Sequence, residues 1–392
     1  MRPAKCAAWA PLVASLLLAS GAQASDATWG LKSTALVGTP IADAGDRSSR
    51  LTLEPSLKWQ VQGIELRARE RLRRIAGAGA HRGDADLREL TAAWRGDDIT
   101  VTVGAQQLNW GRMDILRVTD VINPIDTYDL FYEELPEAKL AQWMANFEWQ
   151  GEGQTLQFIV SPQVPVDRLP TQAMGLPVQT DRPSTSLSNA TLAVRYGVEA
   201  AGWNADFLAL HGWLSAPTLQ PVIESTGPKL LGRLSRQTGV GFSADKPVGP
   251  AVIRLEALYA RITPEVDAVG TAPGTRTQAS FGFGVDVRHG PWFFAAQAIA
   301  AHDRGTTAGS GNNAFLSLIV QRKWLQDRLA GRAMHIRDSR NGSSWSSLQM
   351  AYELTANQLL QLQCDRFDGA PSTPFGAFAD RSRVAASVRL QF

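Results

Sequence analysis

The chain has 392 residues, of which 44% are hydrophobic, and its 39 basic and 37 acidic side chains give a formal net charge of +2. A nearly neutral chain with both signs mixed along its length is not typical of a nucleic-acid-binding protein. After residue 24 no apolar run reaches about 18 residues, which excludes helical membrane spans, and no low-complexity linker divides the chain into several soluble domains.

The N-terminus has the pattern of a secretory signal peptide. Two basic residues precede an apolar stretch at 7–19, and Ala22-Gln23-Ala24 supplies the small-residue cleavage pattern. Residues 1–24 are therefore predicted to be removed, which leaves a mature chain that begins near Ser25. That mature chain contains one cysteine, Cys364, so no intramolecular disulfide can stabilise it.

Strict alternation of apolar and polar residues recurs from residue 25 to residue 392. In the last segment, Val384, Ala386 and Val388 share one face, while Arg383 and Arg389 lie on the other. The clearest segments of this kind are 98–109, 141–150, 276–288 and 382–392. Each is about ten residues long, the length that a tilted strand needs to cross a bilayer with one face on lipid and one on water.

Long and short connections alternate between these segments. Long ones are expected near 39–49, 76–84, 110–140, 161–187, 214–231, 263–275, 303–312, 338–343 and 368–380. Short ones are expected near 62, 96–97, 151–153, 198–202, 246–250, 289–291, 324–327 and 354–357. Long outer loops and tight periplasmic turns are typical of bacterial outer-membrane barrels. The pattern predicts an all-β fold, a transmembrane antiparallel β-barrel over 25–392 with about 18 strands, or 16 as the alternative, and both termini in the periplasm.

Two further features favour the outer membrane of a Gram-negative bacterium. Apart from Trp9, every tryptophan lies near an expected strand end, which predicts aromatic girdles at both membrane interfaces. Trp110, Trp143, Trp213 and Trp345 are expected at the outer interface. Phe392 closes an alternating strand and resembles the end signal of outer-membrane barrels. That resemblance implies recognition by the outer-membrane assembly machinery, with membrane lipid as the surroundings.

Four arginines alternate along the third strand and define an arginine ladder: Arg67, Arg69, Arg71 and Arg73. A barrel of 16 to 18 strands is too wide for its own side chains to fill, so these arginines are expected to line a pore. One interpretation is a basic wall that attracts anionic solutes. The other is a wall neutralised by acids on neighbouring strands. Glu70 falls on the lipid side of this register, which suggests a bulge or a shifted strand.

The third long connection, 110–140, is predicted to be fixed and irregular, because prolines interrupt it and apolar residues favour packing. We expect it to fold into the lumen as a constriction loop with carboxylates across from the arginine ladder; the alternative is a loop that lies over the outer rim. The residues expected to act there are Arg112, Asp114, Arg117, Asp120, Asn123, Pro124, Asp126, Asp129, Glu133 and Glu134.

The run from Gly104 to Gly111, followed by Asp114 and by Asp120 to Asp126, resembles a signature of poorly characterised porin-like proteobacterial barrels. In those proteins a Gly-Arg-Gln strand end leads through Trp-Gly into an Asn-Pro-x-Asp loop. This chain departs from the signature at Ala105, where arginine is usual. The inward third loop is also similar to that of general and substrate-specific porins, and alginate-export-type barrels share the 18-strand plan. None of these resemblances identifies a substrate.

Catalytic motifs are weak in this sequence. The five histidines have no metal-ligand spacing, and His302 beside Asp303 has no serine partner at a recognisable spacing. We therefore expect no enzyme, catalytic residue, metal or cofactor. The leading hypothesis is a porin-like channel for small hydrophilic solutes, with anionic solutes as a candidate class. The alternatives are an export conduit for a polysaccharide or secreted metabolite and a structural barrel with a plugged lumen. No nucleic-acid partner is expected, and a homo-oligomer is compatible with the sequence.

Overall fold

The structure is a computed structural model, and it describes residues 27–41, 47–77, 80–113, 115–128, 135–170, 176–225, 227–265, 274–305 and 310–392. The predicted signal peptide, residues 1–24, lies outside the described residues. Four of the expected loop residues do so as well: Asp114, Asp129, Glu133 and Glu134.

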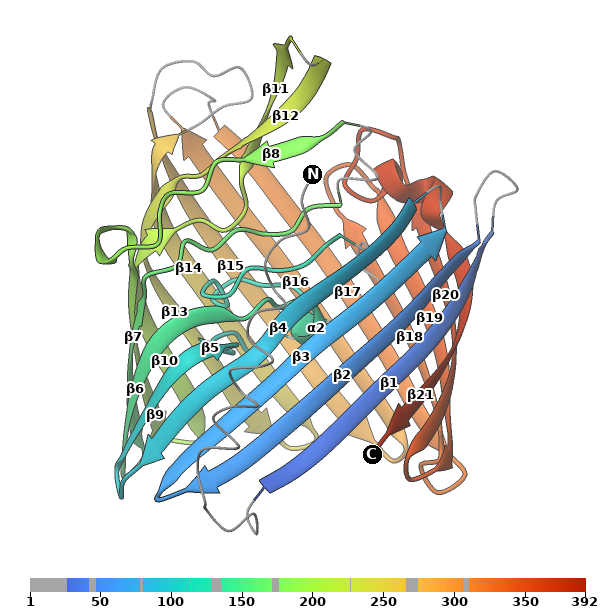
Figure 1. The fold of residues 1–392 in the computed structure, drawn as a ribbon, viewed down its shortest axis with the longest axis horizontal. Helices are drawn as coiled ribbons and strands as arrows, with labels where there is room; N and C mark the ends of the chain where they lie inside the picture. Colours follow the sequence, from blue (N-terminus) through green and yellow to red (C-terminus); the bar gives the residue numbers. More distant parts are fainter. Residues whose placement is uncertain are drawn as a thin grey trace, which may run out of the picture.

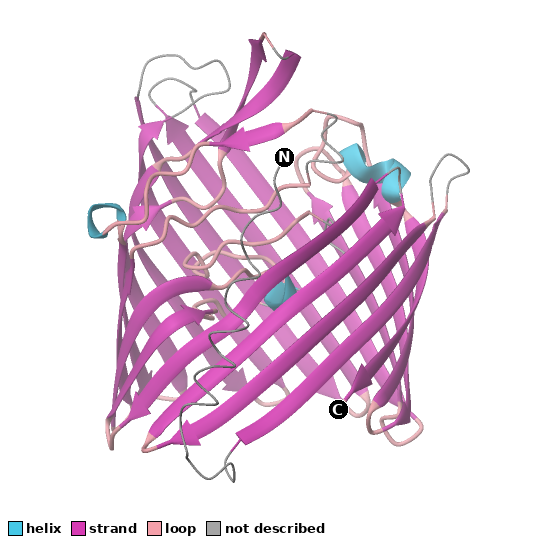
Figure 2. Ribbon diagram, in the orientation of Figure 1, coloured by secondary structure: helices cyan, strands magenta, loops and turns pink. Residues whose placement is uncertain are grey.

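Eighteen antiparallel strands form one closed sheet, which confirms the predicted fold class and strand number (Figures 1 and 2). The strands are β1 Ala27–Pro40, β2 Ser48–Val61, β3 Ile64–Gly77, β4 Ala80–Arg95, β5 Ile99–Gln106, β6 Gln142–Gly151, β7 Gln154–Ser161, β9 Thr191–Ala200, β10 Trp203–Trp213, β13 Arg236–Val248, β14 Ala251–Glu265, β15 Gly274–His289, β16 Trp292–Gly305, β17 Ser310–Trp324, β18 Leu329–Asp338, β19 Ser344–Thr355, β20 Gln358–Asp368 and β21 Arg383–Gln391. Pairing of β1 with β21, from Lys32–Gln391 to Pro40–Arg383, closes the barrel.

Alternation along each strand separates an apolar outer surface from a polar interior. Phe281 and Phe283 on β15 point outward and are 52% and 42% exposed, whereas Asp286 on the opposite face of the same strand is 5% exposed. Large apolar side chains without protein cover are unusual in water and natural against lipid. The sequence alternation therefore produces a membrane-facing belt around a polar lumen.

The second long connection was wrongly placed at 76–84. Only residues 78–79 separate β3 from β4, because Arg71 and Arg73 stand opposite Asp86 and Asp84 and extend the strand pairing upward. The loop expected at 214–231 is also more ordered than predicted. It contains the hairpin of β11 Thr218–Glu224 and β12 Gly227–Arg233, which pairs with β8 Val178–Thr180 and projects above the barrel (Figure 1).

Two tryptophans are not in the outer girdle where they were expected. Trp110 is 1% exposed and packs inside the lumen, and its Nε1 donates to Gln157 Oε1 at 2.8 Å. Trp345 is 7% exposed, stacks on Phe367 at 5.9 Å between ring centroids, and donates to Asp365. Both rings find polar partners for their N–H groups and apolar neighbours inside the barrel, so they stabilise the interior rather than the membrane interface.

The helices of this fold are short and lie in connections: α2 Leu135–Ala138, the 3-10 turn η2 Leu187–Asn189 and the 3-10 helices of η3 Gly376–Arg381 (Figure 2). Among the described residues, no helix is both long and apolar enough to traverse a membrane. The interior is therefore shaped by connections that fold back between the strands.

Candidate functional site: connections inside the lumen

The connection from β5 to β6, residues 107–141, enters the barrel at a glycine. Gly104 has φ +133°, and a Cβ there would lie 2.0 Å from the carbonyl oxygen of Leu90 on β4. Only glycine tolerates both the conformation and the approach. The next two residues, Ala105 and Gln106, are buried, and the chain crosses the lumen with α2 near its middle (Figure 1).

Asn123 and Lys139 join the beginning of the connection to its end. The Asn123 side chain, 0% exposed, accepts from Leu108 N at 2.8 Å and donates to the carbonyl oxygens of Gln106 and Leu140 at 3.0 and 2.8 Å. Lys139 Nζ donates to Leu108 O at 2.9 Å. These hydrogen bonds join the two ends of the connection, which explains physically why an asparagine precedes the proline in the loop.

Charged residues of the connection stabilise this joining of its two ends. Lys139 pairs with Asp120 at 2.5 Å, and burial lowers the pKa of Lys139 although Asp120 acts in the opposite direction. Arg117 donates to the carbonyl oxygens of Asp120 and, at 2.8 Å, Asn123. Arg117 and Asp120 therefore shape the loop and do not extend freely into the lumen.

Glu256 on β14 holds Arg112, Met113 and Thr119 of the connection in place. Its carboxylate is 0% exposed and accepts from the backbone of Arg112, from Met113 N at 2.8 Å, and from Thr119 N and Oγ1, both at 2.9 Å. Four donors on one buried carboxylate satisfy its charge, which is the condition under which such burial is tolerated.

Arg112 anchors the same part of the loop to two other strands. Its guanidinium pairs with Asp206 of β10 at 2.5 Å and with Asp245 of β13. The carbonyl oxygen of Arg112 accepts from Arg254 of β14 at 2.9 Å. The connection therefore contacts three consecutive strands of one wall.

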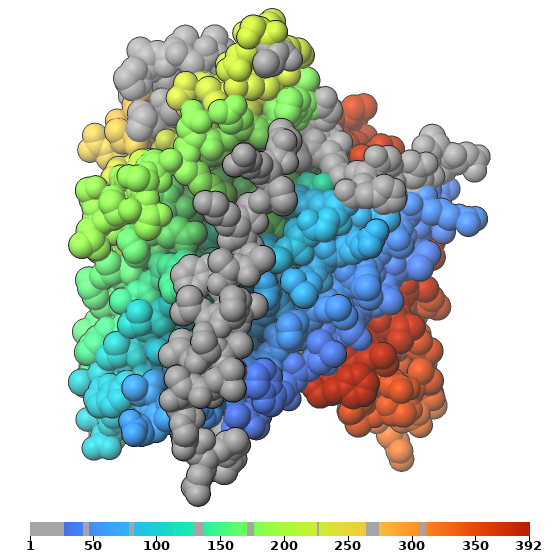
Figure 3. Space-filling model, in the orientation of Figure 1, coloured from blue at the N-terminus to red at the C-terminus, as the bar shows by residue number. Residues whose placement is uncertain are grey.

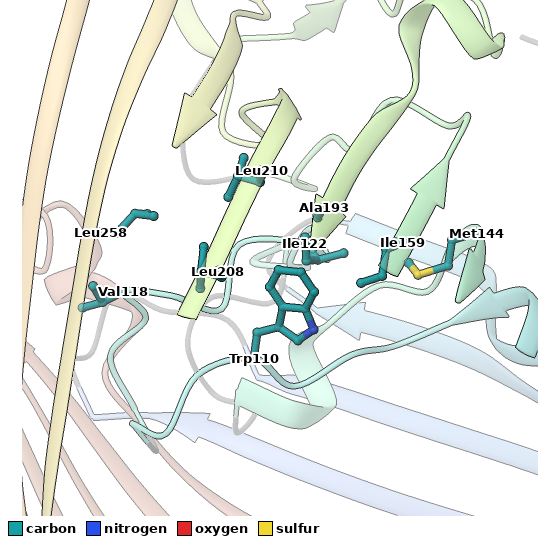
Figure 4. Close-up of a cluster of buried hydrophobic side chains, with 9 residues drawn as sticks. All are labelled: Trp110, Val118, Ile122, Met144, Ile159, Ala193, Leu208, Leu210 and Leu258. Carbon is teal, nitrogen blue, oxygen red and sulfur yellow. The ribbon is translucent and has the colours of Figure 1, made fainter. Parts of the chain in front are cut away.

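Apolar packing reinforces these polar contacts. Trp110, Val118 and Ile122 of the connection join inward-facing side chains of the wall in one buried cluster, and Figure 4 shows the Trp110 ring directed toward Ile122. The wall contributes Met144, Ile159, Ala193, Leu208, Leu210 and Leu258. Burial of these apolar side chains favours a loop held in one position over a loop surrounded by water.

Asp126 and Glu137 of the connection contact β3, which lies opposite β14 in the strand order of the barrel. Arg71 bonds to Glu54 of β2 at 2.7 Å and to Glu137 of α2 at 2.5 Å. Burial would raise the pKa of Glu137, but Lys32 and Arg71 hold it below its ordinary value of 4.5. Glu137 is therefore an ionised link between the loop and the wall.

Arg73 lies in a network with three aspartates. It pairs with Asp84, Asp86 and Asp126 at 3.0, 2.9 and 2.5 Å, and Arg168 pairs with the same three at 3.2, 2.5 and 2.9 Å. Oxygens of these carboxylates lie within 4.8 Å of one another, a spacing that could hold a metal ion. The two guanidinium groups already lie among the carboxylates and offset two of their three negative charges, so the arrangement functions as an ion-pair network.

The remaining ladder residues differ from each other. Arg67 pairs with Glu65 at 2.7 Å, whereas Arg69 has no carboxylate within 4 Å among the described residues. Glu70 does lie at an irregularity: the pairing of β3 with β4 shifts between Arg69 and Glu70, because β4 carries Arg88 as an additional residue. The expected arrangement placed loop carboxylates across the lumen from the ladder. In the structure, Asp126 and Glu137 contact Arg73 and Arg71 directly.

The connection from β7 to β9 also enters the barrel at Asp167 and Arg168, which no sequence pattern indicated. Arg168 N donates to Ile125 O at 2.9 Å, and Ile125 N donates to Asp167 Oδ1 at 2.9 Å, so the two connections run side by side. Burial raises the pKa of Asp167, although the Ile125 N–H opposes the shift. Arg168 and Asp167 were missed because their partners are more than 40 residues away.

Other missed residues belong to strands. Glu256, Asp206 and Asp245 hold the loop, yet in the sequence they resemble any other inward-facing charge. The signal that could have identified Glu256 is its place, with Arg254, as one of two charges in the otherwise largely apolar run 251–260, since a charge on the inner face needs either water or a partner.

Solved structures with the same architecture are outer-membrane proteins. The chain is similar to Acinetobacter baumannii OccAB1 (TM-score 0.55, 8% identity, 94% of this chain and 95% of that one) and to OccAB4 of the same species (TM-score 0.54, 11% identity, 95% and 100%). Pseudomonas aeruginosa OpdQ has a TM-score of 0.53 at 8% identity, over 95% of this chain and 99% of that one. These neighbours are outer-membrane porins, and at such identities the likeness shows the fold.

Comparisons by sequence give no further assignment. No protein-family model matches the chain, and no match to a curated protein is found. The closed 18-strand sheet and its apolar belt define an outer-membrane β-barrel, as the sequence predicted. The resemblance to the family with the Asn-Pro-x-Asp loop stays a prediction.

Proposed function

We propose that this barrel is a porin-like channel for small hydrophilic solutes, narrowed by the connection 107–141. One observation carries the proposal: the connection spans the lumen from Arg71 and Arg73 on β3 to Glu256 on β14. A barrel of 18 strands encloses water unless something fills it. A fixed loop at mid-height therefore determines which solutes pass.

Releasing the loop from β14 tests the proposal. Glu256→Ala removes the acceptor of four hydrogen bonds, so the loop should become mobile and single-channel conductance in planar bilayers should rise and fluctuate. Glu148→Ala is the matched control, because Glu148 is an inward-facing carboxylate that bonds only to Gln150 among the described residues. Equal conductance in the wild type and Glu256→Ala would contradict the constriction.

A preference for anions is the finer part of the proposal, and it depends on Arg69. Ion pairs occupy Arg67, Arg71 and Arg73, which leaves Arg69 as the ladder member with no carboxylate within 4 Å in the described chain. Arg69→Gln should lower the anion-to-cation permeability ratio measured from reversal potentials in a salt gradient. Arg366→Gln, on the outer face of β20, should leave the ratio unchanged.

A barrel with a closed lumen is the second candidate, and a second apolar cluster supports it. Ile115 and Leu116 of the connection pack near Ile336, Trp345 and Phe375, the last of which belongs to the connection between β20 and β21. Connections from two sides therefore meet in the lumen. Absence of conductance steps in the wild type, with steps in a variant lacking residues 115–128, would favour this candidate over the channel.

A further inference from the structure

The wall of the barrel is incomplete between β4 and β6. On one edge β4 pairs with β3 along its whole length, but on the other edge it pairs with β5 only from Leu90 to Arg95. Among the described residues, no backbone hydrogen bond reaches that second edge between Ala80 and Glu89. The strand β5 ends at Gln106, so the outer half of β4 has no neighbouring strand there.

Loop residues occupy the place of the missing strand. The segment 163–169 contains Val164 and Val166, which are 4% and 5% exposed, and Gln163 Oε1 accepts from the backbone of Trp143 at the start of β6. Figure 3 views this side of the molecule, with the residues of β1 to β4 in blue shades and those of the connections in green. Pro165 lies between the two valines and has no N–H to donate, so the segment cannot pair with β4 as a regular strand.

An open cavity of about 500 Å³ remains between β4 and this segment. Its lining includes Leu87 and Trp143, which face outward, and also Asp86 and Gln142, which face inward. The cavity therefore reaches side chains from both faces of the single-layered wall. Its volume lies in the range of about 300–1,000 Å³ that is typical of small-molecule sites.

The lining combines polar groups, which form its larger share, with apolar side chains, and it has a cationic excess. Arg82, Arg168 and Arg182 face two acids, Asp86 and Asp167. Arg168 is committed to the aspartate network, and Arg82 lies over the ring of Tyr128 at 3.9 Å. Arg182 is exposed and has no carboxylate within 4 Å in the described part of the chain. One cation is thus available beside an apolar surface that continues onto the lipid-facing belt.

We propose that this gap is a lateral binding site for a single-chain amphiphile with an anionic headgroup, which enters from the outer leaflet of the membrane. The headgroup pairs with Arg182, and the alkyl chain lies along Leu87 and Trp143. A solute held there is in contact with both lipid and lumen, a route that does not depend on the channel axis.

Binding of laurate to the full mature barrel in phosphatidylcholine nanodiscs tests the site, measured by displacement of a fluorescent fatty acid. We expect saturable displacement, weakened about two- to fivefold in Arg182→Gln, as for one exposed ion pair. Ala141→Trp should abolish it by filling the cavity. Arg304→Gln is the matched control, because Arg304 is another exposed arginine at the outer end of a strand, β16.

The headgroup and the chain are tested separately. Dodecyltrimethylammonium has a similar chain and the opposite charge, and butyrate has the charge and a short chain; neither should displace the probe. If Ala141→Trp fails to show the heat-modifiable gel mobility of a folded barrel, Val178→Trp fills the same cavity. Displacement that is not saturable, or that is equal in Arg182→Gln, Arg304→Gln and the wild type, overturns the proposal.

Discussion

At the scale of single residues, the most buried charges inside this barrel are stable because they have specific partners. Arg73 and Arg168 share three aspartates, and Arg73 itself is 4% exposed. Removing one partner of a buried ion pair is far more costly than replacing both, because the remaining charge stays desolvated. The network is therefore a point at which one substitution affects both the wall and the loop.

Arg73→Gln should destabilise the folded barrel by about 3 kcal/mol, because Asp84, Asp86 and Asp126 then lose one of the two guanidinium groups that they share. The measurement is the urea midpoint of unfolding in detergent, followed by tryptophan fluorescence. Oxygen ligands at this spacing suit Ca²⁺, so calcium should restore part of the lost stability in the variant and have little effect on the wild type. An unchanged midpoint in Arg73→Gln would show that the network is not stabilising.

At the scale of elements, the loop is held at one end by a group that titrates. The pKa of Glu137 is below its ordinary value of 4.5 in the folded protein, so its ionised form stabilises the docked loop. That stability is present above the unfolded pKa and is lost as the pH falls through the lower, folded pKa. Above pH 5 the link between α2 and Arg71 is therefore intact.

Acidification from pH 7 should accordingly increase conductance fluctuations in planar bilayers once the pH falls through the lowered pKa of Glu137, because protonated Glu137 releases Arg71 and Lys32. Glu137→Gln should fluctuate at pH 7 and respond less to acid. Glu224→Gln is the control, since Glu224 lies in the outer hairpin, where it pairs with Lys229. An identical acid response in the wild type and Glu137→Gln would mean that another group is responsible.

The strands could be predicted from the sequence because each one carries its own evidence. Alternation as in Phe281 to Val287 is local, and a shift of one residue would turn the whole face toward the wrong solvent. The interior could not be predicted in the same way. Arg112 and Asp245 are separated by 133 residues, and nothing between them indicates that they meet. Trp110 illustrates the difference, because its position suggested the membrane interface and its partners are in the lumen.

At the scale of the whole molecule, the seam between the first and last strands closes the barrel. The backbone of Phe392 donates to Leu31 O and accepts from Leu31 N, both at 2.9 Å, so its main chain belongs to the closed sheet. Its ring is 70% exposed and adds little to packing. The main chain and the ring of the same residue can therefore be tested apart.

Phe392→Ala keeps both backbone hydrogen bonds and removes only the ring. If the ring is read by the assembly machinery, the variant should refold from urea into detergent as well as the wild type, with the same heat-modifiable mobility, yet reach the outer membrane of cells at a much lower level. Leu390→Ala removes an apolar side chain from the same strand and is the control in both assays. Equal losses in cells and in detergent would mean that the ring stabilises the contact between the first and last strands. Equal levels of Phe392→Ala and the wild type in the membrane would show that the assembly machinery does not recognise the ring.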